Sequence, residues 1–120
     1  MANVLVVDDA LFVRQTIKRI LEANGHKMIG EADNGVKALE LYKMLKPDVV
    51  ILDITMPGMS GIEVLAKLKE MNPDVKVIIC SSMGQQSIVA HAIQLGVSDF
   101  VVKPFKEETL VASLEKVLAK

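Results

Sequence analysis

The sequence predicts an α/β fold in which five parallel strands alternate with five helices. Five short, mostly apolar runs are separated by longer stretches with helical periodicity. The runs that start at residues 49, 77 and 100 are continuously apolar, which indicates strands covered on both faces, as parallel strands are. The five runs are Val4–Val7, Met28–Ala32, Val49–Leu52, Val77–Cys80 and Phe100–Val102. We therefore expect a doubly wound parallel sheet in a chain of 120 residues.

The first and last helices are predicted by apolar residues at helical spacing. The stripes are Val13, Ile17, Ile20 and Leu21 in the first helix, and Leu110, Leu114, Val117 and Leu118 in the last. Gly25 is expected to end the first helix as its C-cap. Pro47 and Pro73 come where the second and third helices should stop, because proline cannot continue a helix.

Every predicted strand delivers polar residues to its carboxyl end. In strand order they are Asp8-Asp9, Asp33-Asn34, Asp53, Ser81-Ser82 and Lys103-Pro104. In an open parallel sheet, ligands bind at this edge, where the strand order switches direction. With the order 2-1-3-4-5 of flavodoxin-like folds, the first and third strands are neighbours, so Asp8, Asp9 and Asp53 should converge in one pocket.

Some of these polar residues are better explained as helix caps. The spacings Ser60-x-x-Glu63 and Ser82-x-x-Gln85 are typical of capping boxes and predict the starts of the third and fourth helices. Asp33 and Asn34 are also interpreted as N-caps, because these residue types commonly cap the helix that follows a strand.

Three carboxylates in one pocket repel each other unless a cation or raised pKa values relieve the repulsion. Oxygen ligands without histidine favour Mg²⁺, which takes one or two carboxylates together with waters and phosphate oxygens. Lys103 can supply a positive charge to a transferred phosphoryl group, and the Ser81 hydroxyl can donate a hydrogen bond to it. Asp53 is then the nucleophile that forms an aspartyl phosphate.

Composition and charge exclude several partners. The 14 Lys and Arg residues and 15 Asp and Glu residues give a net charge of −1, so nothing attracts nucleic acid or an anionic membrane. No apolar run approaches the roughly 20 residues that span a bilayer, and the lone Cys80 is expected to be an inert core residue. We expect a cytoplasmic monomer with one domain over residues 1–120 and no output domain, since the fifth helix ends the chain.

Four separated segments resemble the response-regulator receiver family, and the resemblance covers the whole chain. They are Leu5-Val6-Val7-Asp8-Asp9, the segment LDITMPGMSG that begins at Leu52, Ser81, and Val102-Lys103-Pro104-Phe105. The likeness is greatest to the stand-alone chemotaxis (CheY-like) type. The resemblance implies a single receiver domain.

The resemblance also implies a role for each residue of the pocket. Asp53 would take the phosphoryl group from a phosphohistidine on a histidine kinase. Mg²⁺ would be bound by Asp8, Asp9, Asp53 and the backbone carbonyl of Thr55. Lys103 would pair with the phosphoryl group.

The same resemblance implies a conformational switch. Ser81 would move toward the phosphoryl oxygens and Phe100 would turn inward behind it, which repacks the face made by the fourth helix, fifth strand and fifth helix. Lys103-Pro104 would be a cis peptide. Thr55 and Met83 would tune how fast the phosphoryl group is lost.

The stretch from Val77 to Ser98 contains no Asp, Glu, Lys or Arg, although it includes the whole predicted fourth helix. One interpretation is a helix that is unusually well buried or simply rich in glutamine. The other is a weakly polar exposed stripe that docks a partner helix or peptide.

The sequence favours a two-component phospho-switch that binds a protein target, such as a flagellar switch component, in chemotaxis and the control of flagellar rotation. It would catalyse only its own phosphorylation and dephosphorylation, with a phosphatase as a further partner. One alternative is a single-domain receiver in a different phosphorelay. Another is a Mg²⁺-dependent aspartyl-phosphate phosphatase of the haloacid-dehalogenase type, which needs a second Asp where this chain has Thr55.

Overall fold

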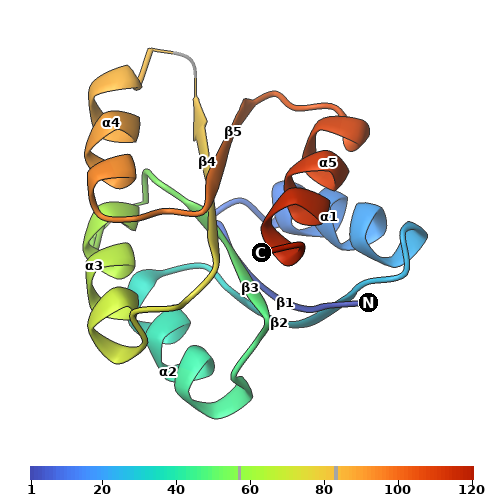
Figure 1. The fold of residues 1–120 in the computed structure, drawn as a ribbon, viewed down its shortest axis with the longest axis horizontal. Coiled ribbons are helices and arrows are strands. Elements are labelled where there is room, and N and C mark those ends of the chain that lie inside the picture. The colour runs from blue at the N-terminus through green and yellow to red at the C-terminus, as the bar shows by residue number, and fades with distance from the viewer. Residues whose placement is uncertain (57, 83) are drawn as a thin grey trace.

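The computed structural model describes residues 1–56, 58–82 and 84–120, in which five strands alternate with five helices (Figure 1). The strands are β1 (Asn3–Val7), β2 (Lys27–Ala32), β3 (Val49–Asp53), β4 (Val77–Ser82) and β5 (Asp99–Lys103). The helices are α1 (Leu11–Ala23), α2 (Gly35–Leu45), α3 (Gly61–Met71), α4 (Gln86–Gln94) and α5 (Glu107–Leu118). Neighbouring strands are parallel in the order β2-β1-β3-β4-β5, which confirms the predicted fold class and strand order.

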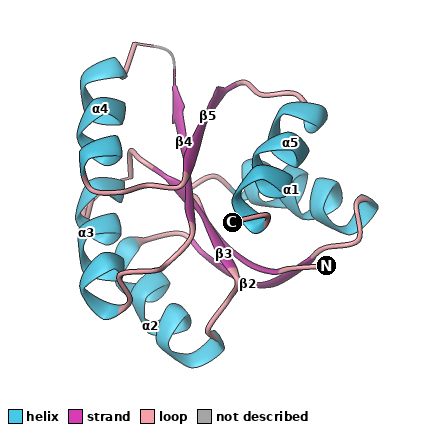
Figure 2. Ribbon diagram, in the orientation of Figure 1, coloured by secondary structure: helices cyan, strands magenta, loops and turns pink. Residues whose placement is uncertain are grey.

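Helices cover both faces of the sheet, with α1 and α5 on one face and α2, α3 and α4 on the other (Figure 2). Each face has its own buried core, because successive strand residues point to opposite faces. On β1, Leu5 and Val7 pack in the core shared with α2, α3 and α4, whereas Val4 and Val6 pack in the core shared with α1 and α5. Burial on both faces explains the continuous apolar runs of β1, β3 and β4. The expectation that the run starting at residue 100 is also covered on both faces is wrong, because β5 is an edge strand on which Phe100 and Val102 are exposed.

Three predicted helix ends are confirmed. The C-cap residue of α1 is Asn24, one residue before the predicted Gly25. Gly25 follows it with φ +80°, a left-handed conformation that glycine adopts without strain, so the helix ends where expected. Ser60 Oγ accepts from the N–H of Glu63 at 3.3 Å at the start of α3. Asn34 Oδ1 accepts from the N–H of Lys37 at 2.9 Å and caps α2.

The predicted caps at Ser82 and Asp33 are wrong. Ser82 is the last residue of β4, where its pairing with β5 keeps it in the sheet, and α4 begins only at Gln86 after the N-cap residue Gln85. The N–H of Ser82 donates to Oε1 of Gln85 at 2.6 Å. This is one of the two hydrogen bonds of a capping box, but no helix begins at Ser82. The carboxylate of Asp33 accepts from Nδ2 of Asn34 at 2.8 Å instead of capping α2.

The register of the sheet brings the polar strand ends to one edge. The pairing of β1 with β3 ends one residue before Asp8 and Asp53. Asp53 pairs with Cys80, the residue before Ser81, and Ser81 pairs with the residue before Lys103. Asp8, Asp53, Ser81 and Lys103 therefore lie at the carboxyl ends of adjacent strands, displaced from one another by no more than about one residue per strand.

Gly61, the first residue of α3, packs directly against the end of β3. A Cβ atom there would overlap the carbonyl oxygen of Asp53 and lie 2.5 Å from Cα of Ile54. The N–H of Gly61 donates to the carbonyl of Ile54 at 3.0 Å, which fixes this close approach. Only glycine allows α3 to begin so near Asp53.

We predict that Gly61→Ala destabilises the protein by about 1–3 kcal/mol, because the new methyl group must push backbone atoms apart. The free energy of unfolding is measured by denaturant titration. Lys67→Ala, at an exposed position of the same helix, is the control and should change stability by no more than about 0.5 kcal/mol. Equal stability of Gly61→Ala and wild type would show that the close approach is not required.

Candidate functional site

Asp8 is buried at the end of β1 and each of its oxygens accepts a hydrogen bond. One carboxylate oxygen accepts from the N–H of Ala10 at 2.9 Å, and the other accepts from Nζ of Lys103 at 2.7 Å. Its backbone carbonyl accepts from Nη1 of Arg14 at 2.7 Å. The side chain of Asp8 is therefore held in one position.

Arg14 belongs to this arrangement although the sequence analysis did not identify it. Its Nε atom pairs with the carboxylate of Glu31 at 2.6 Å, so the guanidinium ties α1 to β2 and to the end of β1. The signal for Arg14 was its place in the first turn of α1, the helix that begins two residues after Asp9. Its partner Glu31 can be identified only once β2 is known to lie beside β1.

Asp53 ends β3 and is only 6% exposed. Its Oδ1 atom accepts from the N–H of Thr55 at 3.1 Å, while Oδ2 lies 3.7 Å from Nζ of Lys103. Oδ2 is therefore the oxygen of Asp53 without a close hydrogen bond in the part of the chain that the structure describes.

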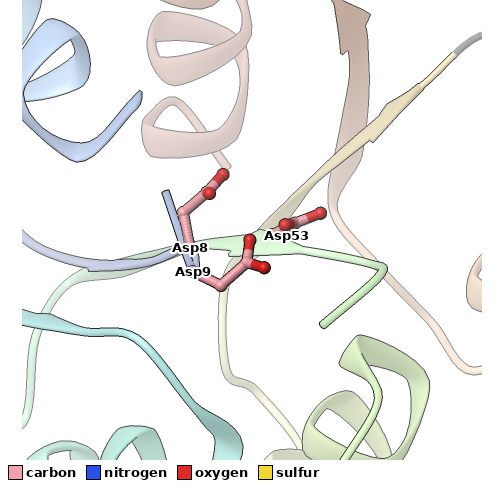
Figure 3. A group of neighbouring side chains, drawn as sticks. All are labelled: Asp8, Asp9 and Asp53. Atoms are coloured by element: carbon pink, nitrogen blue, oxygen red, sulfur yellow. The ribbon is translucent and has the colours of Figure 1, made fainter. Parts of the chain in front are cut away.

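Asp8, Asp9 and Asp53 form one carboxylate cluster (Figure 3). One oxygen from each lies within 4.8 Å of the others, and Asp9 is the exposed member. Burial raises the pKa of Asp53 to about 6; the charges of Asp8 and Asp9 add to this, while Lys103 and the Thr55 N–H oppose it. Three hard oxygen ligands with mutual repulsion fit a divalent cation such as Mg²⁺.

Lys103 is the cation that faces this cluster. Burial by itself would lower the pKa of Lys103, but its hydrogen bond to Asp8 and the charges of Asp53 and Asp8 outweigh that effect and raise the pKa above its ordinary value. The lysine is therefore positively charged at neutral pH. The Lys103-Pro104 peptide that follows is cis, as the family resemblance implied.

Ser81 is buried with an unpartnered hydroxyl. Its side chain is 1% exposed, and among the described residues its Oγ atom has no hydrogen-bond partner. A buried polar group without a partner costs about 1–3 kcal/mol, so native proteins keep such groups for a reason. An oxygen acceptor arriving at the pocket would satisfy it.

Gln85 also reaches this edge of the sheet, and the sequence analysis assigned it only to a helix cap. Its Nε2 atom donates to Oγ1 of Thr55 at 3.0 Å, while its Oε1 atom accepts from the N–H of Ser82. The bond to Thr55 spans 30 positions of sequence. No local pattern could predict it.

The uncharged stretch forms one wall of an apolar groove of about 370 Å³ between α4 and β5. In α4 only Val89 and Ala92 are buried, so the interpretation of a largely buried helix is wrong. Ile93, Phe100 and Val102 are 54%, 40% and 40% exposed. Phe100 therefore lies outward on this face.

Three further residues were singled out by the sequence. Cys80 is buried, and burial raises the pKa of its thiol to about 12, which confirms an unreactive core residue. Met83, which the resemblance placed among the positions that tune phosphoryl loss, lies outside the described residues, as does Pro57 of the LDITMPGMSG segment.

Within the described ranges, no helix is long and apolar enough to cross a membrane.

Comparisons with known proteins cover nearly the whole chain. The family model described as "Response regulator receiver domain" matches residues 4–115. The chemotaxis protein CheY of Thermotoga maritima is 49% identical over 115 residues, which are 96% of each chain. The protein CcdB of Bacillus subtilis is 48% identical over 118 residues, 98% of each chain. The crystal structure of the receiver domain of NtrX from Brucella abortus has a TM-score of 0.92 at 31% identity and covers 98% of this chain and 99% of that one.

We predict that Asp53→Asn stabilises the metal-free protein above pH 6. Because the pKa of Asp53 is about 6 in the folded state and 3.8 for an ordinary Asp, the unfolded chain releases its proton first as pH rises, and the free energy of unfolding falls through this window. The gain should be on the order of 2–3 kcal/mol at neutral pH and should vanish below the lower pKa.

Stability is measured by denaturant titration across pH in the presence of a chelator. Asp74→Asn, at an exposed aspartate, is the control and should follow the wild-type pH profile. A gain from Asp53→Asn that does not depend on pH would contradict the raised pKa.

Proposed function

The chain belongs to the response regulator receiver family, and we propose on that premise that it is a phospho-switch that accepts a phosphoryl group on Asp53 from a phosphohistidine of a histidine kinase. The observation that carries the proposal is the surroundings of Asp53. This buried carboxylate ends a strand between two other aspartates and a charged lysine. A purely structural carboxylate would not need such neighbours.

The geometry suits Asp53 as the nucleophile. With a pKa of about 6, the carboxylate is mostly ionised at neutral pH, and Oδ2 is its less engaged oxygen. In the proposed transfer, this oxygen forms a bond to phosphorus while the bond from phosphorus to the imidazole nitrogen of the kinase breaks and the nitrogen keeps the electron pair. Lys103, 3.7 Å from Oδ2, stabilises the charge on the phosphoryl oxygens.

Mg²⁺ is the proposed cofactor, held by Asp8, Asp9, Asp53 and the backbone carbonyl of Thr55. When bound, it neutralises the carboxylates and the phosphoryl oxygens. The chain itself fixes two of these ligands: the hydrogen bonds from Ala10 and Lys103 hold Asp8, and the Thr55 N–H holds Asp53. Asp9 is exposed and free to turn toward the ion.

The proposed output is a change on the face made by α4, β5 and α5. A phosphoryl oxygen would offer the Ser81 hydroxyl the acceptor that the described residues do not provide. Movement of Ser81 toward it would leave room for Phe100, which is 40% exposed, to turn inward. The apolar groove between α4 and β5 would then change shape and bind a protein target.

Chemotaxis is the proposed pathway because a relative with 49% identity is a chemotaxis protein. The target would be a flagellar switch component, with a phosphatase as a further partner, and the protein would work as a cytoplasmic monomer that modifies only itself. The second candidate is a single-domain receiver in a different phosphorelay, because a relative of 48% identity, the protein CcdB, is not named as a chemotaxis protein. Affinity capture of binding partners with the protein plus beryllofluoride and Mg²⁺ distinguishes the two pathways. Retained flagellar switch proteins would support chemotaxis, and retained proteins of another pathway would support a different phosphorelay.

We predict that Asp53→Asn abolishes labelling by acetyl phosphate in the presence of Mg²⁺ while the circular dichroism spectrum stays unchanged. The asparagine amide is not a nucleophile that forms a stable acyl phosphate. Asp33→Asn, at an exposed aspartate outside the cluster, should be labelled like wild type. Labelling of Asp53→Asn at another residue would overturn the assignment.

We predict that Ser81→Ala still accepts the phosphoryl group but gains much less affinity for its target upon phosphorylation. The mutation removes one hydrogen bond to a charged group, about 1.5–3 kcal/mol, which shifts a two-state population roughly tenfold or more. Target binding is titrated with and without beryllofluoride and Mg²⁺. Ser87→Ala, at an exposed serine that does not line the groove, is the control, and an equal gain in wild type and Ser81→Ala would show that Ser81 transmits nothing.

A further inference from the structure

Gln85 uses both ends of its side-chain amide to join two segments that border Asp53. The oxygen accepts from the N–H of Ser82 at 2.6 Å, and the nitrogen donates to the hydroxyl oxygen of Thr55 at 3.0 Å. A backbone N–H can only donate, so it fixes which end of the amide is the oxygen. The bridge therefore has one orientation, from the end of β4 to the segment after β3.

The bridge continues to Asp53 on one side. Thr55, which receives the bond from Gln85 through its hydroxyl, donates its own N–H to Oδ1 of Asp53 at 3.1 Å. Two successive hydrogen bonds thus connect the carboxylate of Asp53 to the side chain of Gln85. Because hydrogen bonds weaken steeply away from their preferred geometry, a displacement of Thr55 must move Gln85 or break the bond.

The bridge continues to α4 on the other side. Gln85 is the N-cap residue of α4, and its carbonyl accepts from the N–H of Val89 at 3.0 Å. The residue whose side chain contacts Thr55 therefore also holds the first turn of α4 through its backbone. The branch through Thr55 does not pass through Ser81 or Phe100, which lie on β4 and β5, although the other end of the bridge is the N–H of Ser82, next to Ser81.

The residue type suits this role. An asparagine would be one methylene shorter than the glutamine that spans the gap. A glutamate could accept from Ser82, but it would add a fourth negative charge near Asp8, Asp9 and Asp53. The next residue, Gln86, has the same side chain and is exposed, and it forms no side-chain hydrogen bond among the described residues.

We propose that Gln85 is a positioning residue that couples the occupancy of the carboxylate pocket to the first turn of α4, through Thr55. The proposal rests on the proposed function for its biological role, since the pocket there receives Mg²⁺ and the phosphoryl group. A brace that only stabilises the two segments would change the stability of the protein. A coupling residue also changes how α4 responds when the pocket is filled.

The test is the amide chemical shift of residues 86–89 in NMR spectra, recorded during titration with Mg²⁺ alone and then with Mg²⁺ plus beryllofluoride. The proteins are wild type, Gln85→Ala, Thr55→Val, the double variant and the matched control Gln86→Ala. Thr55→Val removes the hydroxyl and keeps the backbone of Thr55. Amides at Asp8, Asp9 and Asp53 report in the same spectra that the pocket is filled.

We expect wild type and Gln86→Ala to show shifts in the first turn of α4 as the pocket fills. Gln85→Ala and Thr55→Val should each lose most of these shifts, and the double variant should lose no more than either single variant, because both remove the same bond. Shifts in Gln85→Ala equal to those of wild type would overturn the proposal. The proposal would also be overturned if the losses of chemical-shift change in the two single variants added up in the double variant, or if the amides of α4 in wild type did not shift as the pocket fills.

Failure of this proposal differs from failure of the proposed function. If acetyl phosphate does not label wild type at Asp53, the proposed function fails, but the titration with Mg²⁺ alone still tests the coupling. If labelling occurs and α4 responds equally with and without Gln85, the function stands and the coupling through Gln85 fails.

Discussion

The repulsion among Asp8, Asp9 and Asp53 is the interaction on which the rest of the site depends. The parallel register of β1 and β3 forces these carboxylates to within 4.8 Å of one another. Lys103, arriving from β5, reaches both buried members, 2.7 Å from Asp8 and 3.7 Å from Asp53. Burial, with the charges of Asp8 and Asp9 added to it, keeps the pKa of Asp53 raised in spite of Lys103. One lysine cannot balance three carboxylates, so the site favours a divalent cation.

The fold tolerates the repulsion among the three carboxylates because the rest of the chain packs as an ordinary parallel α/β domain. Two apolar cores, one on each face of the sheet, hold the strand ends in place, and Gly61 lets α3 start directly against Asp53. Two features of the pocket lower the stability of the protein: the carboxylate cluster and, among the described residues, the unpartnered hydroxyl of Ser81. Features that destabilise one state are suited to a switch, since a ligand that relieves them shifts the population.

The sequence predicted the parts of the structure that follow from local pattern and topology. The strands follow from mostly apolar runs. The convergence of the three aspartates follows from the polar strand ends once the strand order of flavodoxin-like folds is assumed. The cap at Ser82 was wrong, because pairing with Lys103 on β5 keeps Ser82 in the sheet. Arg14 and Gln85 were missed as site residues because their partners, Glu31 and Thr55, are 17 and 30 positions away in sequence.

We propose that a divalent cation relieves the electrostatic repulsion in this pocket. The most direct measurement is an NMR titration of the side-chain carboxyl carbon of Asp53, without and with Mg²⁺. We expect a midpoint near pH 6 in the metal-free protein and a midpoint well below the ordinary aspartate value when Mg²⁺ is present. An ordinary midpoint that is the same under both conditions would contradict it.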